Sequence, residues 1–404
     1  MVAEDMMDTH KVRKIKQYQQ KNTDKKEKKT DVYANAVMFL CIAVIIIIAA
    51  GYIYINGYEA VLGHLLRENI GGTQASVSVQ TGVNYHFDTY HNDVVQCSRD
   101  GIKVIDRNGQ HAWSVAMNLS QPFMQVTSRG IMVADRGGHE VHLITNRNHI
   151  ELIKTDNPII TARMNDSGYV AIVTEARGYQ ARVTVYTPDA APFYIWHSMR
   201  NVIIDVDVSL DGKKMVASVL DTSKGHLSAG VMFFNLHEEV PYAAKELEDM
   251  IVSNIYIRGE QTVIAVADNQ MRSFTLADGS TNWQQGYEGM ILQSYAVSDN
   301  NDIVIALQDK KSGGLFKTSN KIVIYDIAGR ERGSFEIDGN VESLDIKDNV
   351  VVFNVKRDIY IITPRGEKIA KHTVTKDIKL IKLFANKRHI ILISGADMEI
   401  ISIR

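Results

Sequence analysis

The sequence predicts an all-β fold: an eight-bladed β-propeller, with seven blades as the alternative, preceded by one N-terminal transmembrane helix. Three observations lead to this prediction. They are an uncharged apolar run near the N-terminus, strand-like patterning beyond Ala75, and a repeat along the rest of the chain. Of the 404 residues, 45% are hydrophobic and 23% are charged, which excludes a wholly disordered or multi-span chain.

The first two elements are a basic tail, residues 1–31, and an uncharged segment, residues 32–55. About 20 apolar residues in a helix span the roughly 30 Å hydrocarbon layer of a membrane. A cleaved signal peptide is the competing interpretation, but its apolar part is only about 7–15 residues long. Lipid attachment at Cys41 is not expected either, because Leu40 precedes it where a small residue is needed. The sequence therefore predicts a single-pass anchor in the cell membrane, with the lipid bilayer as one partner.

The charge distribution predicts the orientation of this anchor. The tail holds 9 basic and 6 acidic residues, and a basic excess stays on the cytoplasmic side. The N-terminus is then cytoplasmic and the C-terminal domain extracytoplasmic, joined by a juxtamembrane linker over residues 56–74. The rest of the chain is mildly acidic and the net charge of the whole is −2, so no nucleic-acid partner is expected.

The domain over residues 75–404 shows an internal repeat. Each unit contains one strongly apolar strand, and these strands begin near Val94, Ile131, Tyr169, Lys213, Gln261, Asp302, Asn349 and Arg388. The first and last are 294 positions apart over seven intervals, or 42 residues per unit. One strand precedes and two follow the apolar strand in most units. A β-helix has a shorter repeat and a β-sandwich lacks a regular one, so this period indicates propeller blades.

The two ends of the repeat predict how the ring closes. The eighth unit supplies only three strands before Arg404, whereas the alternating segment 75–80 precedes the first unit and is not used by it. An open ring would leave an unpaired sheet edge. We therefore expect residues 75–80 to complete the last blade.

Several segments carry a family resemblance, among them DVSLDGKKMVASV (207–219), VIDRNGQHAW (104–113) and TLADGSTNW (275–283). They resemble WD-repeat-like and quinoprotein-like propellers. The full layout, from basic tail through one span to a propeller, resembles an uncharacterised domain-of-unknown-function family of single-pass, membrane-anchored propellers of Gram-positive bacterial type. That resemblance implies a fold and a location but no activity. No Trp-Asp dipeptide ends a strand, so the partner rules of true WD repeats do not carry over.

One acidic cluster has the residue types of a metal site. Asp205, Asp207, Ser209 and Asp211 occupy alternate positions, so on a strand they would share one face. Oxygen ligands of this kind suit Ca²⁺, but Leu210 stands where the calcium loop needs glycine. We expect no metal ion, with Asp205 and Asp207 as weak candidates, and favour an inner strand that faces a polar channel and is followed by an Asp-Gly turn.

No motif predicts catalysis or a bound cofactor, so we expect a protein that is not an enzyme.

Two long insertions, 220–230 and 309–320, fall between second and third strands and should rise from one face of the ring. They supply the candidate contact residues Lys224, His226, Lys310, Lys311 and Phe316. The leading hypothesis is a scaffold for an unknown protein partner in the cell envelope. The alternative is a propeller enzyme, or a small-ligand or metal sensor, that uses the central channel.

Overall fold

A computed structural model describes Ala43 and residues 70–403 apart from 147–148, 222–227, 249, 299–300 and 311–319. The chain divides into two compact units, Met1–Leu65 and Leu66–Arg404, and the second contains all the described strands. The predicted tail, the predicted span other than Ala43, and most of the predicted linker lie outside the described residues. Within the described part of the chain, we find no helix with the length and apolar character needed to cross a membrane.

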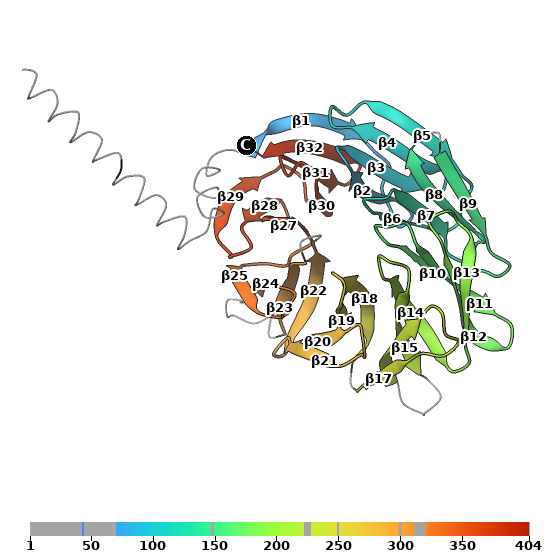
Figure 1. The fold of residues 1–404 in the computed structure, drawn as a ribbon. Coiled ribbons are helices and arrows are strands. Elements are labelled where there is room, and N and C mark those ends of the chain that lie inside the picture. The colour runs from blue at the N-terminus through green and yellow to red at the C-terminus, as the bar shows by residue number, and fades with distance from the viewer. Residues whose placement is uncertain are drawn as a thin grey trace, which may run out of the picture. The chain divides into compact units, whose positions relative to one another are not determined.

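The Leu66–Arg404 unit is a ring of eight four-stranded antiparallel sheets, which confirms the predicted eight-bladed propeller (Figure 1). Blade 1 consists of β2 (His86–Tyr90), β3 (Asp93–Ser98), β4 (Gly101–Asp106) and β5 (His111–Ala116). Blade 2 consists of β6 (Pro122–Val126), β7 (Ile131–Asp135), β8 (Glu140–Asn146) and β9 (His149–Lys154). Blade 3 consists of β10 (Ile159–Met164), β11 (Val170–Ala176), β12 (Tyr179–Tyr186) and β13 (Pro192–Ser198). Blade 4 consists of β14 (Asn201–Val208), β15 (Lys214–Asp221), β16 (Ser228–Asn235) and β17 (Ala243–Leu247).

The second half of the ring repeats this order. Blade 5 consists of β18 (Val252–Arg258), β19 (Thr262–Ala267), β20 (Gln270–Thr275) and β21 (Thr281–Gly286). Blade 6 consists of β22 (Met290–Val297), β23 (Ile303–Asp309), β24 (Asn320–Tyr325) and β25 (Glu331–Ile337). Blade 7 consists of β26 (Ser343–Lys347), β27 (Val350–Val355), β28 (Asp358–Ile362) and β29 (Lys368–Thr373). Blade 8 consists of β30 (Leu380–Leu383), β31 (His389–Ser394), β32 (Asp397–Ile403) and, from the other end of the domain, β1 (Ile70–Ser78).

The outer strand of blade 8 comes from the start of the domain. β1 runs antiparallel to β32, with Ser76 opposite Glu399 and Val77 opposite Met398. The strand begins at Ile70, so it takes in residues that the sequence had placed in the linker. Pairing of the two ends covers the edge that β32 would otherwise expose.

The hydrophobic core is divided among the blades. Eight clusters of buried apolar side chains are present in the described domain, one between each pair of neighbouring blades. The cluster between blades 8 and 1 joins Val79 and Phe87 to Met398 and Ile400. Burial of apolar surface stabilises the fold by about 25 cal/mol per Å². The interface that closes the ring is therefore stabilised by the same kind of contact as the interfaces between the other blades.

Outer strands are held to the next blade by turns that need glycine. Gly329, in the turn between β24 and β25, has a φ of 77°, and a Cβ there would lie 2.5 Å from Cδ2 of Trp283 on β21. The indole nitrogen of Trp283 donates to the carbonyl oxygen of Ile327 in the same turn at 2.9 Å. Glycine therefore lets the blade 6 turn lie flat on the tryptophan of blade 5.

Candidate functional site

The inner strand of each blade borders the centre of the ring, and Asp205 and Asp207 lie on one of these strands, β14. β14 ends at Val208, so Ser209 and Asp211 belong to the following turn rather than to the strand. There the hydroxyl of Ser209 donates to Asp211 Oδ1 at 2.6 Å. An inner strand followed by an Asp-Gly turn, the preferred interpretation, is therefore what the structure has, and the alternative of four oxygen-bearing side chains on one strand face does not hold because β14 ends at Val208.

Asp205 and Asp207 hold the next blade. Asp205 Oδ2 accepts the backbone N–H of Ile255 at 3.0 Å, and Asp207 Oδ2 accepts that of Ile257 at 2.7 Å. Both donors lie on β18, whose channel side has no neighbouring strand. An inner strand has one unpaired edge, and buried backbone N–H groups need acceptors. The two carboxylates supply those acceptors.

Arg163 on β10 links a third blade to this contact. Its Nη2 lies 3.1 Å from Asp205 Oδ2, and its Nη1 donates to the carbonyl oxygen of Ile255 at 2.5 Å. Burial raises the pKa of Asp205 and of Asp207, and the guanidinium of Arg163 opposes that rise. Burial also disfavours the charged form of Arg163, but Asp205 and Asp207 outweigh it and raise the pKa of Arg163. The group is a buried ion pair that spans blades 3, 4 and 5.

Blades 7 and 8 use the same device. Asp345 Oδ2 accepts the backbone N–H of Leu383 at 2.8 Å, and the hydroxyl oxygen of Ser343 accepts that of Ile381 at 3.2 Å. Recurrence at a second interface shows that inner-strand carboxylates connect blades. No group of three or more metal-ligating side chains occurs among the residues described. The geometry of Asp205 and Asp207 is accounted for by this structural role.

Aromatic and basic side chains pack beside Arg163. The guanidinium carbons of Arg163 and Arg258 lie 4.7 and 4.9 Å from the ring centroid of Tyr256. The hydroxyl of Tyr256 is 3.3 Å from that of Tyr295 on β22, and burial raises the pKa of Tyr295. Cation–π contacts of this kind contribute about 0.5–2 kcal/mol each. Sequence reasoning missed Arg163, although a lone charge in the strand IITARM of blade 3 is an unusual feature.

One face of the ring, here called the loop face, carries the starts of the inner strands, the turns between second and third strands and the ends of the fourth strands. Both long insertions open on it. Lys310 lies there, exposed in a turn after β23, whereas Lys224, His226, Lys311 and Phe316 lie outside the described residues. The predicted contact residues are therefore not brought together in the part that the structure describes.

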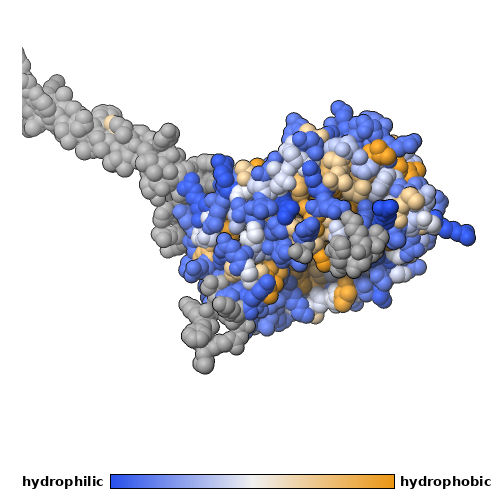
Figure 2. Space-filling view, turned by 90° about the horizontal axis from the view of Figure 1, so that it is seen from below, coloured by the Kyte–Doolittle hydropathy of each residue, from blue (hydrophilic) through white to orange (hydrophobic). Residues whose placement is uncertain are grey.

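Exposed apolar side chains do occur on the loop face. Met199, Ile251 and Ile291 stand at the starts of the inner strands of three successive blades, and Met199 is 76% exposed. Tyr179, the first residue of β12 in blade 3, and Val83, in the loop between β1 and β2, are also exposed there. On the opposite face Leu210 and Val240 of blade 4 are exposed. Four more exposed apolar side chains lie on the outer strands of blades 2 and 3: Ile150, Leu152, Phe193 and Ile195. The side of the molecule shown in Figure 2 is mostly hydrophilic, with separate hydrophobic areas.

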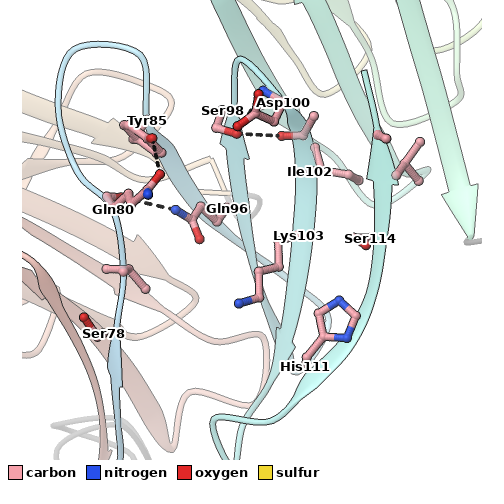
Figure 3. A pocket seen from close by; sticks show the side chains of 14 residues that line it. Ser78, Gln80, Tyr85, Gln96, Ser98, Asp100, Ile102, Lys103, His111 and Ser114 are labelled. Atoms are coloured by element: carbon pink, nitrogen blue, oxygen red, sulfur yellow. Dashed lines mark hydrogen bonds between the residues drawn. The ribbon is translucent and has the colours of Figure 1, made fainter. Parts of the chain in front are cut away.

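A cavity of about 440 Å³ lies between β1 and blade 1, where the ring closes, and is called the seam cleft here (Figure 3). Its polar side chains come from β1 and the loop after it, and from β3, β4, β5 and the turn between β3 and β4. They are Ser78, Gln80, Tyr85, Gln96, Ser98, Asp100, Lys103, His111 and Ser114. The side-chain amide of Gln96 donates to the carbonyl oxygen of Gln80 at 3.2 Å, and the hydroxyl of Tyr85 donates to Gln80 Oε1 at 2.5 Å. These contacts fix the upper wall seen in Figure 3. Sequence reasoning did not identify this cleft.

Comparison with known proteins identifies the family and supports the fold. A family model described as "Family of unknown function (DUF5711)" matches residues 72–403. The chain is similar to the structure of BamB from Moraxella catarrhalis, with a TM-score of 0.50, 10% identity, and coverage of 82% of this chain and 97% of that one. It is also similar to the β-propeller domain of Cps50 (Swd1) from Myceliophteria thermophila, with a TM-score of 0.49, 8% identity, and coverage of 82% and 99%. No curated protein matches it. At such low identity, the likeness to BamB shows the fold alone.

Proposed function

The chain belongs to the DUF5711 family of unknown function, and we propose that it is a membrane-anchored propeller that binds a protein partner of the cell envelope through its loop face. The anchor is the uncharged segment 32–55, and the basic tail before it keeps the N-terminus in the cytoplasm. The propeller is then extracytoplasmic. No catalytic step is part of this proposal.

The observation that carries the proposal is the distribution of exposed apolar side chains. Met199, Ile251 and Ile291 lie within two residues of the starts of three neighbouring inner strands, on the loop face. Exposed apolar groups that gather on one face favour a protein contact, since such contacts bury them from water. A ring stiffened by buried ion pairs presents that face without a large loss of conformational entropy on binding.

The contact is tested by crosslinking in intact cells that express the full-length chain. Met199→Glu and Ile251→Glu place charges on the loop face, and Val240→Glu, at a residue 66% exposed on the opposite face, is the matched control. The proposal predicts that one specific crosslinked partner is lost in the first two variants and kept in the control. Equal capture by all three variants would contradict it.

Anchoring is tested separately. Deletion of residues 1–55 should release the propeller from the membrane fraction, and protease added outside intact cells should digest the propeller of the full-length protein. If the protease reaches the outer side of the membrane and the propeller of the full-length protein is still not digested, the predicted orientation is contradicted.

A further inference from the structure

We infer that the seam cleft is a binding site for a small acidic saccharide, a sugar whose hydroxyl groups meet the polar walls and whose carboxylate meets Lys103. The cleft volume of about 440 Å³ is in the range of small-ligand sites, which is roughly 300–1,000 Å³. This inference does not depend on membrane anchoring or on the proposed protein partner, because the cleft is lined by residues of blades 8 and 1 and not by Met199, Ile251 or Ile291 of the loop face.

The first argument comes from the repeat itself. The second strand of each blade begins with an apolar residue that faces the preceding blade, and two positions later a second side chain faces the same way. In blades 2 to 8 this second side chain is apolar and almost fully buried: Val133, Ile172, Ala217, Ala265, Ile305, Phe353 and Leu392. In blade 1 it is Gln96, the only polar residue among these eight positions, all of which the structure describes.

Gln96 is 9% exposed, so it occupies a core position without a core side chain. An amide at a position where the seven other blades have an apolar residue removes a favourable packing contact. The free-energy cost of burying the polar amide has to be offset by hydrogen bonds. Its nitrogen has the carbonyl of Gln80 as partner. Its oxygen faces the cleft in Figure 3, available to a donor from a ligand.

The second argument is charge. Lys103 lies directly opposite Gln96 on β4, with Ser114 opposite Lys103 on β5. Figure 3 shows the lysine extending toward β1, into the cleft. Neither Lys103 nor His111 has a hydrogen-bond or ion-pair partner within the described ranges. The acidic group in the lining, Asp100, sits in the turn at the other end of the cleft. A ligand carboxylate near Lys103 would form a charge-assisted hydrogen bond.

The third argument distinguishes a sugar from an extended peptide. β3 and β4 are paired on both sides, and β1 is paired along its inner side to β32. The part of the floor made by β3 and β4 therefore offers side-chain groups and no free backbone edge for strand addition, whereas β1 and β5, as the last strands of their blades, each have one edge unpaired in the described domain. Serine hydroxyls and glutamine amides each donate and accept hydrogen bonds, which suits the hydroxyl groups of a sugar ring.

The test is calorimetric titration of the purified full-length protein with glucuronate, with glucose as the neutral probe and a short Glu-rich peptide as the rival. Two variants alter the cleft: Lys103→Met removes the charge, and Gln96→Leu restores the apolar residue of the other blades. Lys368→Met, at an exposed lysine on the outer strand of blade 7, is the control. We expect each cleft variant to weaken glucuronate binding by about tenfold or more, with glucose bound at least about tenfold more weakly than glucuronate.

Folding of the variants is checked by their melting temperatures. Gln96→Leu should melt no lower than the wild type, because it extends the apolar cluster between blades 8 and 1. Absence of glucuronate binding to the wild type, unchanged binding by Lys103→Met, or tighter binding of the peptide than of the sugar would each overturn the inference.

Discussion

Asp205→Ala tests whether the inner-strand carboxylates connect blades. Asp205 is 6% exposed, and its carboxylate lies 3.1 Å from Nη2 of Arg163 and 3.0 Å from the backbone nitrogen of Ile255. The substitution leaves a buried guanidinium without its nearest counter-ion and a strand edge without its acceptor. Breaking a buried pair by removing one partner costs about 3–5 kcal/mol.

This free energy converts to a measurable shift. An unfolding entropy of about 2.1 cal/mol/K per residue gives roughly 0.7 kcal/mol/K for a domain of about 330 residues. A loss of about 3–5 kcal/mol then lowers the melting temperature by about 4–7 °C. The assay is differential scanning calorimetry of the full-length protein. Asp211→Ala is the control, since Asp211 is exposed in the following turn, and its shift should be about 1 °C or less.

A double variant separates the ion pair from other effects. Arg163→Met combined with Asp205→Ala should be less destabilised than Asp205→Ala alone, because no uncompensated charge remains buried. Two results would refute the reasoning: a shift for Asp205→Ala no larger than that for Asp211→Ala, or a rise in the wild-type melting temperature with Ca²⁺ that Asp205→Ala abolishes.

Three further outcomes are expected. Gly329→Ala should lower the free energy of unfolding, measured by urea denaturation, by about 1–3 kcal/mol more than Gly178→Ala does. The reason is that a Cβ at Gly329 would meet the indole of Trp283 on blade 5, whereas a Cβ at Gly178, which has a similar φ, would meet open space. Equal losses in the two variants would contradict the close packing. Burial raises the pKa of Cys97 to about 12, so its thiol should resist iodoacetamide at pH 8 until the domain unfolds, as read by peptide mass spectrometry; rapid native alkylation would show that the site is accessible. Lys382→Met removes the cation that Asp345 faces, and burial already raises the pKa of Asp345, so the variant should raise the folded-state pKa of Asp345 further. A raised folded-state pKa contributes stability at low pH that is lost as pH rises through it, so the loss of unfolding free energy in the variant should be largest near neutral pH and shrink on acidification. A loss that does not change with pH would contradict this pairing.

The fold could be predicted from the sequence because each blade repeats the same local signal. The apolar second strand recurs at near-constant intervals, and the surplus alternating segment at 75–80 matches the strand missing from the last unit. Both signals are short-range patterns of alternation and turn residues, which do not require knowledge of distant contacts.

The roles of individual polar side chains could not be predicted in the same way. Asp205 meets Ile255, fifty positions away, and this contact depends on how two blades pack. A rule of strict alternation also fails after Val208, where β14 ends and Ser209 and Asp211 enter a turn. One feature of the sequence is related to the seam cleft: Gln96 of VVQCS stands where the other repeats have an apolar residue. This difference can be interpreted only when it is known that the chain after β1 packs beside Gln96.

The closing strand is tested most directly by a disulfide between its ends. Ser76 and Glu399 face each other across β1 and β32, at a separation that a cross-strand disulfide can bridge. In the full-length protein, Ser76→Cys with Glu399→Cys should oxidise to a linkage that mass spectrometry assigns to these two positions, without loss of the folded state. Ser76→Cys with Glu331→Cys, on the outer strand of blade 6, should not link. Failure of the first pair to form the bond, or equal linkage in the second, would contradict a ring closed by its N-terminal strand.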